Sequence, residues 1–305
     1  MQIDISSAQG TQIFKMISQE NEFEPETFEA LFHFCDLHKS VCFFDIGSNI
    51  GIFPLALSQY REIYKNEALE SSGNNTHPDF VIHAHEPLPM LKDISHRLMQ
   101  DNNISYHLHT TAISDTKGTA DFYVSAMSDS SNSLMEGFRP AKGTLKVNVE
   151  TLDELYFHYL NKSAFDQVIL KVDVETFEPQ VLEGAKKILN EYRPVIICEI
   201  LANRTERKLE PLFKGHEYNM YRYNGEFWVL EDNLFGDPNY QYRDWLFLPR
   251  ELFSEEFLLC EPDYDTSMTF KFENPQNRKK FQVSKYLLRN SKRILQRIKN
   301  LRTLN

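Results

Sequence analysis

The stretch FFDIGSNIGIF, residues 43–53, decides the fold. An apolar run rich in β-forming residues ends in Asp45, and two glycines and an asparagine follow before apolar residues return. A buried strand alone requires neither an acid nor a glycine. Glycine permits tight turns and close backbone approach, and the first turn of a helix offers free N–H groups. The stretch therefore predicts a strand, a tight turn and a helix that together receive a ligand.

Strand-like and helical patterns alternate around this stretch. The expected strands occupy residues 41–47, 80–87, 104–114, 119–125, 165–175 and 193–200, and the expected helices residues 26–38, 52–64, 90–103 and 178–192. This order implies parallel strands joined by right-handed crossovers, so the predicted fold class is α/β with a mostly parallel, doubly wound sheet. A hairpin at 218–230 and a strand at 244–249 predict an antiparallel edge.

Three regions follow from these patterns. Residues 1–40 are expected to form an N-terminal helical extension, residues 41–250 the main domain, and residues 251–305 a C-terminal extension with a basic amphipathic tail. No run approaches the ~20 apolar residues of a membrane span, and the N-terminus lacks the pattern of an export signal. The four cysteines show no CxxC spacing, which predicts buried free thiols and a cytoplasmic location.

The net charge of −11 is segregated along the chain. Residues 276–305 contain ten Lys or Arg and no Asp or Glu, so the rest of the chain is strongly acidic. The acidic body argues against nucleic acid as a partner. The tail carries an apolar helical stripe, which predicts contact with an anionic membrane surface, with an acidic protein, or with the chain's own acidic body. The oligomeric state is not predicted.

The opening stretch reads DxGxNxG, which differs from the GxGxxG pattern of dinucleotide-binding turns. Its acid would repel a pyrophosphate, which disfavours NAD as the cofactor. S-adenosyl-L-methionine has a cationic sulfur, an amine and an unphosphorylated ribose, and it fits the acid better. Glu86, at the end of the second expected strand, can accept both ribose hydroxyls. The structural alternative is that the glycines only permit packing and that Asp45 only caps the helix.

Several motifs, in this order, resemble those of FkbM-type methyltransferases. They are FFDIGSNIG, HAHEP, TAISDTKGTADFYVS, SDSSNSL, VETLDEL, ILKVDVETFEPQVLEGA and PVIICE, which together span about residues 41–200. The resemblance implies a Rossmann-like class I methyltransferase fold and S-adenosyl-L-methionine as cofactor. It also implies O-methylation of a small molecule or glycan acceptor, such as a glycan, a glycolipid or a secondary metabolite.

The resemblance further implies a cofactor site at the ends of the strands. Its residues are Asp45, Gly47, Asn49 and Gly51 around the methionine part, Glu86 at the ribose and Asp115 at the adenine amine. Asp115 can equally be an ordinary turn acid. Two departures from the family pattern stand out: Thr176 occupies a position where the family usually has glycine, and residues 62–79 form an insertion.

Asp173 and Glu175 are the predicted catalytic residues. They alternate along the end of a strand and so point the same way, and a carboxylate there can orient an acceptor hydroxyl or remove its proton. We favour Asp173 for that role. One alternative is an ion-pair network with Lys171, and another is Mg²⁺ bound by Asp173, Glu175 and Glu199. We predict no metal. A non-catalytic binding module that recruits partners through the basic tail is the alternative function.

Overall fold

The computed structural model describes residues 24–58, 60–61, 79–128, 130–160, 165–224 and 228–252. The basic tail, Cys260 and nearly all of the insertion at 62–79 lie outside the described residues. The three-region division of the chain therefore stays a prediction.

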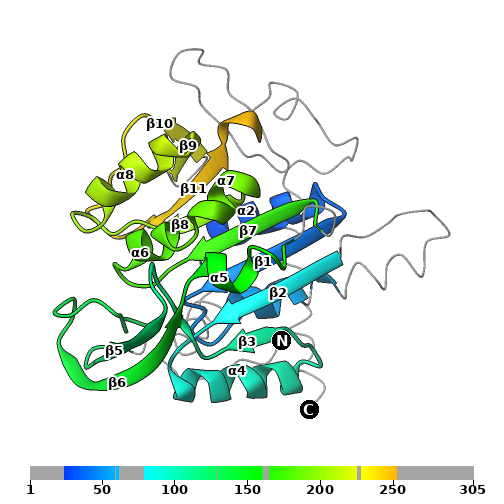
Figure 1. Cartoon of the computed structure of the whole chain (residues 1–305). Coiled ribbons are helices and arrows are strands. Elements are labelled where there is room, and N and C mark those ends of the chain that lie inside the picture. The colour runs from blue at the N-terminus through cyan, green and yellow to red at the C-terminus, as the bar shows by residue number, and fades with distance from the viewer. Residues whose placement is uncertain are drawn as a thin grey trace.

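An eight-stranded mixed sheet forms the centre of the protein (Figure 1). Its strands are β1 (Ser40–Ile46), β2 (Asp79–His85), β3 (His107–His109), β7 (Gln167–Val172), β8 (Val195–Glu199), β9 (Tyr218–Tyr223), β10 (Trp228–Glu231) and β11 (Asp244–Pro249). The order is β10-β9-β11-β8-β7-β1-β2-β3. Five neighbouring strands pair in parallel, in the order β8, β7, β1, β2 and β3. Strand β11 runs antiparallel to β8 and β9, and β10 runs antiparallel to β9. The predicted parallel sheet with an antiparallel edge is confirmed.

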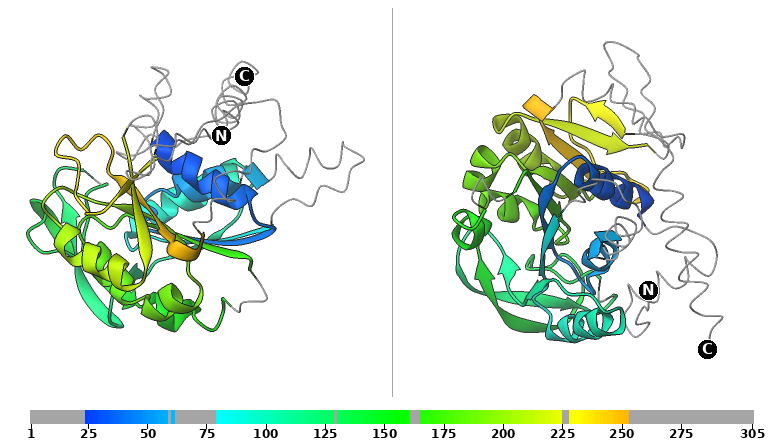
Figure 2. Two further views of the ribbon diagram at one scale, coloured as in Figure 1. Left: turned by 90° about the horizontal axis from the view of Figure 1, so that it is seen from above. Right: turned by 90° about the vertical axis from the view of Figure 1, so that its right-hand side faces the viewer.

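Helices cover both faces of this sheet, as the views in Figure 2 show. The helices α2 (Pro25–Asp36) and α4 (Pro89–Asp101) and helical residues 52–58 contribute to one apolar cluster. The helices α5 (Leu152–Tyr156), α6 (Glu178–Glu183), α7 (Lys186–Glu191) and α8 (Glu206–Gly215) contribute to the other. In β1, Phe43 packs into the first cluster and Phe44 into the second. Burial on both faces explains why the strand is apolar without alternation.

A second, three-stranded sheet lies beyond the carboxyl ends of β1 and β2 (Figure 1). It consists of β4 (Ala112–Ile113), β5 (Gly118–Ser125) and β6 (Ala141–Glu150), in the order β4-β6-β5. The single strand expected at 104–114 is therefore wrong: the chain there forms β3, which pairs with β2, and β4, which pairs with β6. Strand β6 was not predicted, although Val147 and Val149 alternate with exposed residues on it.

The single helix expected at 178–192 is also wrong, because it breaks into α6 and α7 at Gly184. A Cβ on Gly184 would lie 2.0 Å from the carbonyl oxygen of Ser114, so the chain passes close to β4 at the break. The new helix begins where the Asp153 carboxylate accepts hydrogen bonds from the N–H groups of Lys187 (2.9 Å) and Ile188 (3.0 Å). A side chain from α5 thus satisfies the free donors at the start of α7.

Two features bear on the location of the protein. Within the described residues, no helix has the length and apolar character needed to cross a membrane. Cys35, Cys42 and Cys198 are buried free thiols, as predicted.

Candidate active site

The turn after β1 places backbone, not side chains, against the ends of two other strands. The N–H groups of Gly47 and Ser48 both donate to the carbonyl oxygen of His85, at 3.0 Å each. Gly47 has φ +85°, and a Cβ added there would lie 1.8 Å from the carbonyl oxygen of Asp173. Glycine is therefore required at this position both for its backbone angle and because the end of β7 leaves no room.

Asp45, directly before this turn, is 1% exposed and is paired in register with Lys171 on β7. Burial raises the pKa of Asp45 to about 7, and Lys171 opposes that rise. Its Oδ2 atom is buried and, within the described part of the chain, has no hydrogen-bond partner. The site thus contains a buried acceptor that a donor or cation could satisfy.

Glu86 follows β2 and is also buried. One carboxylate oxygen accepts a hydrogen bond from the N–H of Asn49 (3.0 Å) and the other from the N–H of Leu88 (2.9 Å). These two bonds fix the orientation of the carboxylate. Each oxygen has a second lone pair, so the group can accept further hydrogen bonds.

A pocket lies where these elements meet. Among its lining residues are Gly47, Asn49, Glu86, Asn132, Asp173 and Glu175. Three of the six predicted cofactor residues therefore line it directly, and Asp45 directly precedes the lining residue Ile46. Gly51 does not line the pocket. A Cβ there would lie 2.2 Å from the hydroxyl oxygen of Tyr106, so glycine lets the turn pack closely against this side chain.

Asp115 lies elsewhere. It is exposed, and its Oδ1 accepts hydrogen bonds from the hydroxyl groups of Ser114 (2.9 Å) and Thr116 (3.4 Å). It is not among the residues that line the pocket. This is the arrangement of a turn acid, and its contact with adenine stays a prediction.

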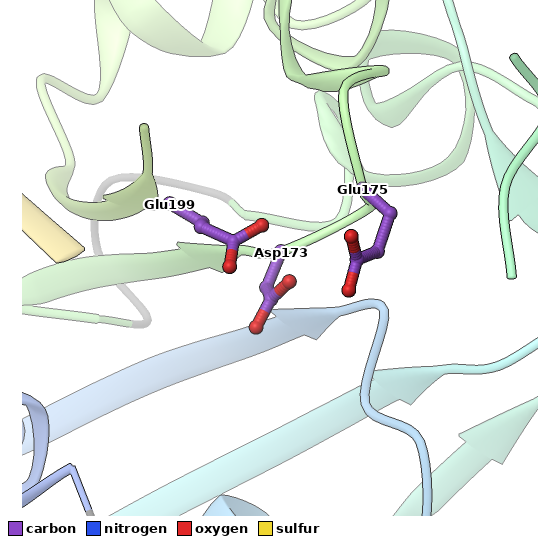
Figure 3. Close-up of side chains that lie close together, drawn as sticks. All are labelled: Asp173, Glu175 and Glu199. Atoms are coloured by element: carbon purple, nitrogen blue, oxygen red, sulfur yellow. The ribbon is translucent and has the colours of Figure 1, made fainter. Parts of the chain in front are cut away.

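Asp173, Glu175 and Glu199 converge at the ends of β7 and β8 (Figure 3). One carboxylate oxygen from each lies within 4.8 Å of the others. Lys171 Nζ is 3.1 Å from Asp173 Oδ2, and Arg243 Nη1 is 2.5 Å from Glu199 Oε1. Of the ion-pair network considered from the sequence, the pair Lys171–Asp173 is present, whereas no ion pair of Glu175 is found among the described residues. A second cation, Arg243, which the sequence did not indicate, pairs with Glu199.

The three carboxyl groups differ in their pKa values. Burial opposes ionisation of Asp173, but Lys171 and Arg243 together lower its pKa below the usual value. Burial and the neighbouring Asp173 raise the pKa of Glu175 to about 8. Burial and Asp173 also raise the pKa of Glu199 well above its usual value. The cluster thus combines Asp173, whose pKa is lowered, with Glu175 and Glu199, whose pKa values are raised.

The same three oxygens form the one group within the described residues whose geometry could hold a metal ion. Oxygen ligands suit Mg²⁺ or Ca²⁺. Two of the three carboxyl groups are already paired with Lys171 and Arg243. The absence of a metal stays a prediction.

The loop after β7 is held in place by the carboxylate of Glu178. Glu178 Oε1 accepts hydrogen bonds from the N–H groups of Val174 (3.2 Å) and Thr176 (3.1 Å). This loop has two successive residues with positive φ, Glu175 at 55° and Thr176 at 80°. Thr176 is 5% exposed, and its buried hydroxyl has no hydrogen-bond partner among the residues that the structure describes. A β-branched residue rarely adopts such an angle, which explains why glycine would be usual at this position.

Three solved methyltransferase or cofactor-bound structures are similar to this chain at low sequence identity and low TM-score. A FkbM methyltransferase from Methylobacillus flagellatus KT matches at 14% identity and a TM-score of 0.39, over 69% of this chain and 44% of that one. A precorrin-6y C5,15-methyltransferase from Geobacter metallireducens GS-15 matches at 14% identity and 0.35, over 73% and 84%. Cofactor-bound Rv0187 from MTB matches at 10% identity and 0.39, over 75% and 82%. No curated protein matches the chain.

The family assignment comes from a family model rather than from these structures. The chain spans less than half of the Methylobacillus flagellatus protein, and no TM-score reaches 0.5. The family model described as the methyltransferase FkbM domain matches residues 45–235, which is more than half of the chain. This range contains the turn after β1, Glu86 and the acidic cluster. The chain belongs to the FkbM methyltransferase family.

Proposed function

We propose that this protein is an S-adenosyl-L-methionine-dependent O-methyltransferase that acts on a hydroxyl of a glycan, a glycolipid or a secondary metabolite. The observation that carries the proposal is the buried Oδ2 of Asp45, which has no hydrogen-bond partner within the described residues and belongs to the residue directly before the pocket residues Ile46 and Gly47. A buried carboxylate oxygen without a partner is unfavourable. The ammonium group of S-adenosyl-L-methionine is a donor of the right charge.

Two further features support this cofactor. The Glu86 carboxylate is held in place by backbone N–H groups and keeps acceptor capacity for the two ribose hydroxyls. Gly47 contributes backbone without a side chain to the pocket wall, and the position of its missing Cβ is filled by the carbonyl of Asp173. When bound, S-adenosyl-L-methionine supplies an electrophilic methyl group on a positively charged sulfur.

The acceptor hydroxyl must be placed in line and must lose its proton as it reacts. Asp173 is held ionised by Lys171, 3.1 Å away, which suits a residue that orients the hydroxyl. Glu175 also lines the pocket, and its pKa of about 8 makes its ionised form a stronger base than an ordinary carboxylate near that pH. We therefore assign orientation of the hydroxyl to Asp173, one of the two roles drawn for it from the sequence, and proton removal to Glu175, the other predicted catalytic residue.

Calorimetry tests the cofactor assignment. The wild-type protein should bind S-adenosyl-L-methionine and not NAD, and Asp45→Asn should bind the cofactor at least about tenfold more weakly because the charged partner is lost. Asp121→Asn is the matched control, since Asp121 lies on β5 and pairs with Lys146. Equal cofactor affinity of wild type and Asp45→Asn would exclude the assignment.

Turnover assays separate an enzyme from a binding module. Purified protein should convert the cofactor to S-adenosylhomocysteine with at least one member of a panel of hydroxylated acceptors, and Glu175→Gln should lower kcat by about 10²–10⁴-fold. Cofactor binding without turnover across the panel would favour the non-catalytic module. The same assay with a chelator tests the metal prediction, because loss of turnover that Mg²⁺ restores would show a required ion.

A further inference from the structure

Two arginines from different parts of the chain meet over one aromatic ring. Phe138 and Arg139 belong to the loop between β5 and β6, and Arg204 follows β8. Arg139 Cζ is 4.7 Å from the centroid of the Phe138 ring, and Arg204 Cζ is 5.6 Å from it. Phe138 is 8% exposed, so the ring is a fixed platform for both guanidinium groups.

Neither arginine is neutralised within the part of the chain that the structure describes. Three other arginines have carboxylate partners: Arg193 pairs with Glu251, Arg222 with Glu231 and Arg243 with Glu199. No ion pair involves Arg139 or Arg204 among the described residues, and the Nε of Arg139 is buried without a hydrogen-bond partner. A guanidinium donor that is buried and unpaired is costly, and an anion would satisfy it.

The pair lies beside the proposed reaction centre. Ser130, Asn132 and Leu134 of the same loop line the pocket. Ser133 Oγ donates a hydrogen bond of 2.8 Å to the carbonyl oxygen of Glu175, which ties the loop to the acidic cluster. The positive charge of Arg139 also acts on Glu175, where it opposes the larger effect of burial on the pKa. An anion bound at the arginines would therefore lie on the loop that Ser133 ties to Glu175.

We propose that Arg139 and Arg204 bind an anionic group, a carboxylate or a phosphate, of the acceptor substrate. This inference rests on the methyltransferase function proposed above and narrows its substrate class to acidic hydroxylated molecules. Guanidinium groups form paired hydrogen bonds with the oxygens of both groups, so they recognise geometry as well as charge. Anchoring the acceptor at this point would leave a neighbouring hydroxyl facing Glu175 and Asp173.

The first experiment measures anion binding without any assumption about the acceptor. Inorganic phosphate is titrated by calorimetry, at constant ionic strength, into the full-length wild type, the double variant Arg139→Gln/Arg204→Gln, and Arg207→Gln. Arg207 is an exposed arginine of α8 and serves as the matched control. The basic tail is present in all three proteins, so its contribution to phosphate binding is the same.

We expect the double variant to bind phosphate at least about tenfold more weakly than the wild type and the control. Equal phosphate affinity of the wild type and the double variant, including no binding by either, would overturn the proposal. Binding of S-adenosyl-L-methionine to the same proteins reports on the cofactor site separately. The double variant should keep that affinity, which also shows that it is folded.

The second experiment identifies the source of the anionic group. Glucuronate and glucose 6-phosphate are compared with glucose as ligands of the cofactor-loaded protein. Tighter binding of glucuronate indicates a carboxylate, and tighter binding of glucose 6-phosphate indicates a phosphate; either preference should disappear in the double variant. A preference that persists in the double variant would overturn the assignment to these arginines.

Discussion

Thr176 offers a direct test of strain in the loop that carries the catalytic candidates. Its φ of 80° is unfavourable for a β-branched residue, and its buried hydroxyl lacks a hydrogen-bond partner. Its N–H is bonded to Glu178 Oε1, and that bond does not depend on the side chain. The substitution Thr176→Gly should therefore relieve two unfavourable features and keep the backbone contact. We expect the variant to be more stable than the wild type.

Four contributions set the size of this effect. A left-handed backbone costs an ordinary residue roughly 1–2 kcal/mol, and an unsatisfied buried hydroxyl about 1–3 kcal/mol. Against these, glycine increases the entropy of the unfolded chain by about 0.4–1 kcal/mol, and loss of the methyl group removes about 0.8 kcal/mol of burial. The free energy of unfolding should rise by about 2 kcal/mol. The Tm should then rise by roughly 4–8 °C.

Chemical denaturation and calorimetry of the wild type and three variants measure this difference. Thr176→Ala keeps a Cβ at positive φ but removes the hydroxyl, so it should recover only part of the gain. Thr116→Gly, at an exposed turn position without positive φ, should lose about 0.4–1 kcal/mol. If Thr176→Gly is no more stable than the wild type, the loop is not strained at this residue.

Three further predictions concern the turn after β1 and its charges. Gly47→Ala should prevent folding or lower the free energy of unfolding by more than about 3 kcal/mol, because the new Cβ would meet the Asp173 carbonyl. The control is Gly143→Ala, where the space around the new Cβ is open, and it should leave the free energy of unfolding nearly unchanged in the same denaturation assay. Lys171→Met should lower the free energy of unfolding by about 3–5 kcal/mol at pH 8 and by less at pH 5. Without Lys171, the folded-state pKa of Asp173 should lie above its unfolded-state value, so protonation of Asp173 at low pH favours the folded state. Denaturation at both pH values tests the sign of this difference. Binding of S-adenosyl-L-methionine near pH 6 should release a proton from Asp45, because its pKa of about 7 falls when the carboxylate pairs with the cofactor; near pH 9 Asp45 should release none. Calorimetry in buffers of different ionisation enthalpy measures the number of protons released. Unchanged proton release in Asp45→Asn would contradict the prediction.

The parts of the site that follow from local rules were predictable from the sequence. The turn after β1 is one, because glycines at positive φ and an acid at a strand end leave a signature within a few residues. The departure at residue 176 was also visible in the sequence, since the family usually has glycine there, and the structure gives Thr176 a positive φ that suits glycine. Both features depend on backbone geometry that neighbouring residues impose.

The parts that depend on distant pairing were not predictable. Arg243 reaches Glu199 because β11 inserts between β8 and β9 and pairs antiparallel with β8, which no periodicity in either segment reveals. The break between α6 and α7 depends on Asp153, a capping side chain from a separate helix. In each case the deciding contact joins segments more than 30 residues apart, where single-sequence patterns carry no information about register.

The distribution of charge explains how a Rossmann-like sheet can select a cationic cofactor. Seven acidic residues surround two cations, Lys171 and Arg243; they are Glu24, Asp45, Asp173, Glu175, Glu178, Glu199 and Asp244. Because these groups cannot all ionise when buried, a positive ligand would gain affinity by displacing protons, whereas a diphosphate would be repelled by the excess of acidic groups over cations. This supports the cationic cofactor proposed above. Arg139 adds a positive charge whose effect reaches Glu175. If the acceptor carries the anionic group proposed above, opposite charges at the arginines and at the acidic cluster would orient it, with its hydroxyl toward the carboxylates.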